Sequence, residues 1–306
     1  MSNAIPLLEG TSASGGYLVP DIYVQDAFQQ GIDRQSAVAQ LARIRRVNAK
    51  RVQFTEYVGR PTAAFVAEGA DKAATGAAYN QVTVDIKKVA STVIYTEELI
   101  EDAQSDPTVL VNQDVRAAIS DLIDAHALGH SPSGAVTTQF NNALANTTQT
   151  VEFGTTGDAA ALAVSSAIQT VRGNGYQANG IIVGPDMERV LRDARDGYGR
   201  PLFSDGFVSA PSSIYGLNMS RSTNLTPVST TAASGNVVAI VGDFSQALLA
   251  VRDDIRVKFS DQATINVSGT DHRLWQQNKV AALWETRVGF VAHDLNRAFV
   301  AIVNAA

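Results

Sequence analysis

Few side chains in this sequence have the types and spacing that chemistry requires. His126 and His130 lie four residues apart near the predicted end of a helix, a spacing compatible with a metal ion. Ala-Leu-Gly separates them, so the glutamate that a zinc hydrolase uses as its base is missing. The helix also ends between the two histidines, and a histidine near a helix C-terminus is favourable for the helix dipole alone. We therefore interpret this pair as structural and predict no metal site.

Motifs for other reactions and cofactors are absent as well. The sequence contains no glycine-rich nucleotide loop of either common type and no nucleophile elbow of the form G-x-S-x-G. It has no cysteine, which excludes disulfides, thiolate catalysis and cysteine-ligated zinc. No pair of carboxylates is marked out as an acid–base dyad. We predict no catalytic residue, no cofactor and no enzymatic activity.

Composition describes an ordinary globular protein. The chain has 306 residues, enough for roughly two domains, and 45% of them are hydrophobic. Its net charge of −6 argues against a globally basic nucleic-acid binder. No apolar run approaches the roughly 20 residues of a membrane span, and the start, MSNAIPLLEG, lacks the basic and apolar regions of a signal peptide. We therefore expect no membrane association.

An oversized hairpin is the most distinctive element of the chain. Alternating apolar residues predict two strands, one with Val52, Phe54 and Val58 on a single face and one with Val82, Val84 and Ile86. The tip between them, residues 59–81, is rich in alanine and glycine and cannot build a core. Hairpin loops usually close within a few residues. We therefore expect the tip to leave its own domain and lie on a neighbour, with Phe65–Val66 and Tyr79 as apolar anchors.

Two charged runs of opposite sign stand out. Six cations and no acid fall between residues 34 and 51: Arg34, Arg43, Arg45, Arg46, Lys50 and Arg51. Five acids and no base follow later: Glu97, Glu98, Glu101, Asp102 and Asp106. Each run could be a solvated face. We hypothesise instead that the two runs meet, within one subunit or between subunits.

The remaining pattern mixes helices and strands. A helix that begins near Thr96 leads to a longer one over 108–128, about 30 Å in length, whose apolar stripe consists of Val111, Val115, Ala118, Ile119, Leu122 and Ile123. A short helix is expected near Phe140–Leu144. The second half predicts helices at 158–173 and 185–195 and strands at 180–183, 237–241, 247–251, 255–259, 280–290 and 299–303. This arrangement indicates an α+β fold around a central sheet.

Taken in order, the segments resemble the major capsid proteins of tailed bacteriophages with the Hong-Kong-97-type fold. GGYLVP at 15–20 looks like the N-arm motif of that family, and AFVAEGA at 64–70 followed by VDIKKVASTVIYTEELIEDA looks like its E-loop and the entry to its spine helix. SPSGAV at 131–136 is similar to the turn after the spine. The later resemblances are GYQANGIIVGPDMERVLRDARDGYGRPLF, IYGLNMSRSTNL, VGDFSQALLAVRDDIRVKFS and ETRVGFVAHDLNRAFVAIV. Together they cover nearly the whole chain.

The resemblance implies both a domain plan and a function. The segments would be an N-arm (1–49), an E-loop hairpin (50–95), a P-domain with a spine helix (96–150), an A-domain with a central sheet (151–250) and return strands that complete both domains (251–306). The chain would form pentamers and hexamers of an icosahedral shell around double-stranded DNA, without sequence-specific binding. The alternatives are an encapsulin-type nanocompartment shell that packages enzymes and, third, a soluble α/β enzyme with an unrecognised site.

Partners and location follow from the same resemblance. A portal protein is expected, and a decoration protein is a further possible partner. No long segment precedes GGYLVP, so a separate scaffolding protein is implied. The chain would assemble in the bacterial host cytoplasm and reside in the virion.

Contacts between subunits are expected at three places. Arg60, Glu68 and Lys72 of the E-loop tip should lie against a neighbour; Arg43, Arg45 and Arg46 should face an acidic strip or the lumen; and Tyr198, Gly199 and Arg200 should approach the capsomer axis. Some relatives join an E-loop lysine to an asparagine covalently. Lys72 with Asn266 or Asn278 could do so here, but we favour a non-covalent contact.

Overall fold

The fold comes from a computed structural model of the chain. Predictions that concern residues 1–35, Arg60, Glu101, Asp102 and Asp106 lie outside the residues that it describes. The described residues are 36–59, 61–69, 71–72, 75–98, 107–131, 134–135, 137–153, 157–195, 198–200, 213–225, 237–267 and 269–304.

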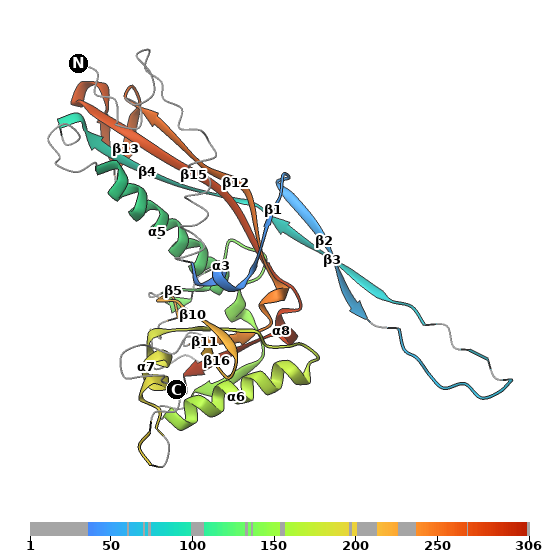
Figure 1. The fold of residues 1–306 in the computed structure, drawn as a ribbon. Helices are drawn as coiled ribbons and strands as arrows, with labels where there is room; N and C mark the ends of the chain where they lie inside the picture. Colours follow the sequence, from blue (N-terminus) through green and yellow to red (C-terminus); the bar gives the residue numbers. More distant parts are fainter. Residues whose placement is uncertain are drawn as a thin grey trace.

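One body of the molecule is a four-stranded sheet with a long helix along it (Figure 1). The strand order is β1 (Arg43–Arg46), β12 (Ala247–Ser260), β15 (Lys279–Ala292) and β4 (Lys87–Thr96). β1 pairs with β12 in parallel, and the other pairs are antiparallel. The strands predicted at 247–251 and 255–259 are one continuous β12, which passes through register shifts between Val251 and Arg256.

The helix on this sheet is α5 (Pro107–Leu128), the predicted spine. Its buried positions include Val115, Ile119 and Ile123, as the apolar stripe predicts. Ala118 and Leu122 of the same predicted stripe are exposed, so that part of the prediction is wrong. Two polar residues of α5, Ser120 and Asp124, are buried as well. Asp124 accepts hydrogen bonds at the start of α3 (Ala37–Leu41).

The second body is a six-stranded sheet covered by helices. Its order is β7 (Thr150–Phe153), β16 (Phe299–Asn304), β11 (Val237–Gly242), β8 (Gly180–Val183), β10 (Leu217–Arg221) and β9 (Ser213–Ile214). Helices α6 (Gly157–Gly173) and α7 (Pro185–Asp193) pack on one face. β8 and β11 are buried at every position, since the alternate side chains enter two different cores.

Smaller elements complete the chain. The predicted helix near Phe140–Leu144 is wrong in its position, because the chain forms one 3₁₀ turn, η1, at Leu144–Asn146. The remaining short elements are β5 (His130–Ser131), β6 (Gly134–Ala135), β13 (Thr264–Val267), β14 (Thr270–Arg273), α8 (Leu295–Ala298) and the 3₁₀ turns η2 (Phe244–Gln246) and η3 (Trp275–Gln277).

The predicted hairpin consists of β2 (Arg51–Gly59) and β3 (Ala78–Asp85), and it projects far from both bodies (Figure 1). Only its root is packed, where Val84 and Ile86 join a small core with Leu248 and Val291. A single residue, Ile86, separates β3 from β4. The arm is therefore anchored directly in the four-stranded sheet.

Helix α3 lies between the two bodies. On one side it contacts α5, and on the other it contacts β8 and β10. Ser220 of β10 donates a hydrogen bond to Gln40 at 2.9 Å, and the first three residues of α3 are buried. This short helix therefore joins the spine to the six-stranded sheet.

Candidate inter-subunit surfaces

His126 and His130, whose spacing is compatible with a metal ion, have separate surroundings. The Nδ1 atom of His130 lies 2.8 Å from the carbonyl oxygen of Asn224 in a buried position. The ring of His126 packs edge-on against Phe140, with 6.2 Å between the ring centroids. Among the described residues no group of three or more His, Cys, Asp or Glu side chains could hold a metal ion. None of the described helices combines the length and apolar character of a membrane span.

The hairpin tip presents its side chains to solvent. Phe65 has a relative exposure of 110%, and Val66 and Tyr79 are exposed as well. Glu68 and Lys72, two of the predicted contact residues, are also exposed. Residues 61–67 belong to no helix or strand, so their backbone groups take no part in a sheet ladder. The tip therefore exposes apolar and charged side chains together.

The predicted cationic contacts lie on an exposed edge strand. All four residues of β1, Arg43–Arg46, are exposed. The guanidinium of Arg45 lies over the ring of Phe54 at 5.3 Å, and Arg43 donates to the carbonyl oxygen of Ser245 at 3.5 Å. The edge therefore combines positive charge with the hairpin root.

Within one chain this basic edge does not reach the described part of the acidic run. Arg46 is opposite Val251, which is opposite Val288 of β15. Thr96, which precedes Glu97, is opposite Lys279. Lys279 and Val288 are nine residues apart on β15. At about 3.3 Å per residue this separation is about 30 Å. For Arg43–Arg46 with Glu97 and Glu98, the hypothesis that the two runs meet inside one subunit is wrong, because the same sheet holds these residues at opposite ends.

The third predicted contact is a loop after α7. Tyr198 and Arg200 are exposed, and the Arg200 guanidinium lies 6.0 Å from the Tyr198 ring centroid. Gly199 between them has a φ of +81°, a conformation that glycine adopts without strain. The glycine therefore suits the turn that brings this cation and this ring together at the surface.

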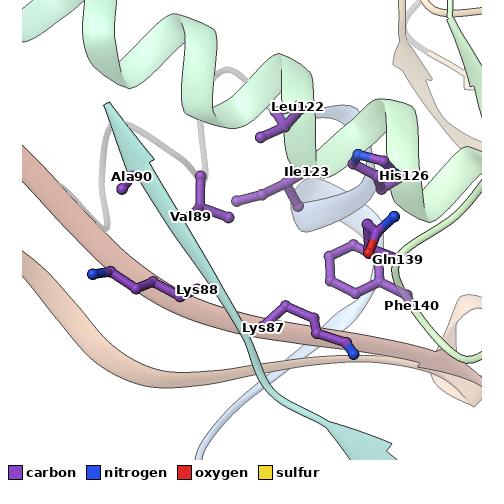
Figure 2. Close-up of a pocket in the computed structure, with 9 residues that line it drawn as sticks. All are labelled: Lys87, Lys88, Val89, Ala90, Leu122, Ile123, His126, Gln139 and Phe140. Carbon is purple, nitrogen blue, oxygen red and sulfur yellow. The ribbon is translucent and has the colours of Figure 1, made fainter. Parts of the chain in front are cut away.

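A cavity of about 350 Å³, which no sequence pattern predicted, lies between β4 and α5. Figure 2 shows side chains of α5 above the strand and Phe140 beside it. The lining residues are Lys87, Lys88, Val89, Ala90, Leu122, Ile123, His126, Gln139 and Phe140. The cavity is therefore mainly apolar, with lysines on the strand side.

Some polar groups around this cavity have hydrogen-bond or ion-pair partners, and one has no partner in the described part of the chain. Lys88 forms an ion pair with Glu285, which also pairs with Lys258 at 3.3 Å. The hydrogen bonds from these two lysines lower the pKa of Glu285. By contrast, the buried Nδ1 atom of His126 has no hydrogen-bond partner among the described residues. Burial lowers the pKa of His126, which favours the neutral imidazole.

A buried carboxylate of α5 is hydrogen-bonded to the start of α3. Asp124 of α5 is 3% exposed. Its oxygens accept hydrogen bonds from the Ser36 hydroxyl at 2.6 Å, the Ala37 N–H at 2.7 Å and the Val38 N–H at 3.2 Å. Burial raises its pKa to about 6, although the three hydrogen bonds act in the opposite direction. Asp124 therefore positions the start of the described chain.

Comparison with known proteins gives consistent matches. Residues 15–303 match the phage capsid family. The probable major capsid protein gp17 of Mycobacterium phage L5 is 27% identical over 96% of this chain and 91% of its own length. These matches confirm the resemblance that the sequence motifs suggested.

Solved structures show the same fold. A chain of Mycobacterium phage Ogopogo is similar with a TM-score of 0.72 and 22% identity, over 89% of this chain and 92% of that chain. A chain from the capsid of a native GTA particle computed with C5 symmetry is similar with a TM-score of 0.65 and 16% identity, over 88% and 90%. The predicted α+β fold class is confirmed.

Proposed function

Because this chain belongs to the phage capsid family, we propose that it is a major capsid protein that assembles into the pentamers and hexamers of an icosahedral shell enclosing double-stranded DNA. The observation that carries the proposal is the projecting hairpin, whose tip exposes Phe65 and Val66 without a core of its own. Such apolar exposure marks an interaction site. The family is one of structural proteins, which agrees with the lack of catalytic motifs in the sequence.

The shape of the chain suits a ring of identical subunits. A hairpin tip that binds a different part of the next copy makes a head-to-tail contact. Such contacts repeat around a ring when the rotation closes. We assign Arg60, Glu68 and Lys72 to this contact. Tyr198, Gly199 and Arg200 would lie nearer the ring axis.

The basic edge is assigned to a second contact. Arg43, Arg45 and Arg46 would face an acidic strip of a neighbouring subunit or the lumen. Since the acidic residues Glu97 and Glu98 are about 30 Å away in the same chain, a contact of Arg43–Arg46 with these two residues would occur between subunits. Charge reversal of Arg45 and Arg46 that left assembly intact would remove this assignment.

The domain plan and the partners are part of the same proposal. The N-arm, E-loop, P-domain, A-domain and return strands keep the boundaries given above. A net charge of −6 agrees with a shell that surrounds DNA without binding its phosphates through many Lys and Arg side chains. A portal protein, a separate scaffolding protein and a decoration protein are the proposed partners, with assembly in the host cytoplasm. An encapsulin-type shell is not favoured, because the matching family and relatives are phage capsid proteins.

A shortened hairpin tests the proposal directly. Gly59 and Ala78 are paired across the hairpin, so Asn-Gly can replace residues 60–77 as a two-residue turn. We expect the wild-type chain, with scaffolding protein supplied, to form closed shells in electron micrographs, and shells from infected cells to protect DNA from nuclease. The shortened variant should keep the same thermal melting curve, because the deleted tip packs on no core of its own chain. It should form no shells, because the proposed contact with the neighbouring subunit is missing.

Two outcomes would contradict this account. A wild-type chain that stays monomeric with scaffolding protein present would overturn the shell function. Shells of normal size from the shortened variant would show that the tip is not the assembly contact. Boiled shells on a denaturing gel also decide the covalent question, since a single monomer band excludes a link from Lys72.

A further inference from the structure

We infer that the face of the four-stranded sheet opposite α5 binds an acidic segment of a different protein. Four side chains on three strands form the surface, which we call the cationic patch: Lys88, Arg256, Lys258 and Arg287. Arg256 and the two lysines are exposed, and Arg287 is half-buried. The inference goes beyond the proposed function, because the patch is complete in a single chain and does not require assembly.

The cationic patch lies on the face of the sheet that α5 does not cover. Trp284 of β15 points toward α5, since its indole N–H donates to the Asn112 side chain at 2.9 Å. Side chains alternate between the two faces of a strand, so Glu285 and Arg287 point to the opposite face. The hairpin root packs on one end of that face, at Val291. The patch begins where this packing ends.

The register of the sheet brings the four cations together. Lys88 of β4 is directly opposite Arg287 of β15. Arg256 of β12 is opposite Glu285, and Lys258 is two residues further along the same strand. Outward positions on one strand are about 7 Å apart, and neighbouring strands are about 5 Å apart. The patch therefore measures about 13 Å along the strands and about 10 Å across them.

Charge in the patch is mainly positive, although the whole chain has a net charge of −6. Glu285 forms ion pairs with Lys88 and Lys258. Asp253 is a second acid, opposite Arg287 in the register. Lys88 and Arg287 are like charges directly opposite each other, which destabilises a sheet and is typical of a functional site. The excess of cations therefore suits an anionic partner.

The composition of the face favours a protein over a nucleic acid as this partner. Glu285 lies on the strand between the two lysines with which it pairs, and its side chain remains 17% exposed. A nucleic-acid strand carries a phosphate at every nucleotide and would place charge against this carboxylate. A protein can present a neutral side chain there. Exposed uncharged residues also border the cations, at Ala90, Thr92 and Ser260, and such a mixed surface suits carboxylates separated by neutral groups.

A labelled peptide tests the patch on the full-length chain. The probe is a peptide of about ten residues in which Glu and Thr alternate, and the peptide with Gln in place of Glu is the uncharged control. We expect fluorescence anisotropy to show binding of the acidic probe alone, both to the unassembled chain and to closed shells. Raising NaCl from about 0.01 M to about 0.15 M should weaken binding about tenfold, because the screening length falls from about 30 Å to about 8 Å.

Charge variants identify the surface that binds the probe. Arg256→Glu/Lys258→Glu should weaken binding about tenfold, and Lys88→Gln/Lys258→Gln about threefold. The matched control, Arg172→Glu/Arg189→Glu, makes the same change in net charge at exposed sites on α6 and α7 and should bind as the wild type does. Melting curves show which variants are folded, and the Gln pair decides if the Glu pair is not.

Four results would overturn the inference. They are absence of binding to the unassembled chain at low salt, equal binding by the patch variants and the control, tighter binding of duplex DNA than of the acidic probe, and binding to the unassembled chain but not to closed shells. The last result would mean that other copies of the chain cover the patch. All four leave the shell function intact, whereas failure of the wild type to form shells would contradict only the proposed function.

Discussion

Replacing Asp124 by asparagine should change how the stability of the unassembled chain depends on pH. The side chain is nearly isosteric but cannot ionise. In the native chain, the three groups that donate to Asp124 are one hydroxyl and two backbone N–H groups, so the buried carboxylate is hydrogen-bonded to neutral partners. The nearby Asp121 charge also raises its pKa.

The size of the effect follows from the pKa. Burial raises the pKa of Asp124 from 3.8 to about 6, so the folded chain binds the proton more tightly than the unfolded chain. The stabilisation by this proton is complete below pH 3.8 and is lost as the pH rises through about 6. A tenfold change in proton affinity corresponds to about 1.4 kcal/mol. The unfolding free energy of the wild type, measured against Asp124→Asn, should therefore fall by about 2–3 kcal/mol between pH 4 and pH 7.

Urea denaturation followed by tryptophan fluorescence measures this difference, because Trp284 is buried. Other titrating groups are shared by the two proteins, so their contributions cancel in the comparison. Loss of the Ala37 hydrogen bond in the variant adds an offset that does not depend on pH. A difference that stays constant within about 0.5 kcal/mol from pH 4 to pH 7, or that grows as the pH rises, would refute the reasoning.

Three further substitutions test the packing of the two bodies and of the hairpin. Gly184→Ala should destabilise the chain by about 3 kcal/mol or more in urea denaturation, because the added Cβ would lie 1.9 Å from a backbone carbonyl oxygen after β10; Gly173→Ala, with open space around its Cβ, is the control that should lose no stability. Trp284→Phe should lower the unfolding free energy by about 1–3 kcal/mol, because the indole N–H donates to the Asn112 side chain at 2.9 Å; an unchanged value would show that this bond between sheet and spine does not matter. Arg51→Ala should leave the melting temperature unchanged, since its ion pair across the hairpin is exposed, and a clear drop would contradict that view.

Local patterns were sufficient to predict the regular elements. The strand over Gly180–Val183 is observed with the same bounds, and the spine helix differs from its prediction by one residue. In both segments, apolar residues recur with the period of the element, or form an uninterrupted run between turn residues. The hairpin was predictable for a related reason, since alternation marks its strands and the alanine-rich tip offers nothing to bury.

Pairings between distant segments were not predictable from such patterns. β1 contains three arginines and resembled only a charged run, yet it pairs with Leu248–Val251 some 200 residues away. The strands predicted at 247–251 and 255–259 left a gap at residues 252–254. The chain instead continues through an irregular register as one strand, because β15 supplies partners on both sides of the irregular stretch.

The candidate site shows the same limit. The exposure of Glu68 and Lys72 followed from the composition of the tip, whereas the cavity is lined by three separate segments of the chain. The sequence did contain one signal for the contact between α5 and α3. Ser120 and Asp124 are four residues apart on one side of α5, where both are buried, and a polar pair at helical spacing beside an apolar stripe can mark a second contact face.

The position of β16 has a consequence for synthesis of the protein. This strand lies between β7 and β11 in the six-stranded sheet, although β11 is complete at residue 242. At about 5–20 residues per second, the ribosome needs roughly 3–12 seconds more to reach residue 304. During that interval the apolar strand VVAIVG keeps one unpaired edge. Growing chains are therefore vulnerable to aggregation, and only finished subunits present a complete body for assembly.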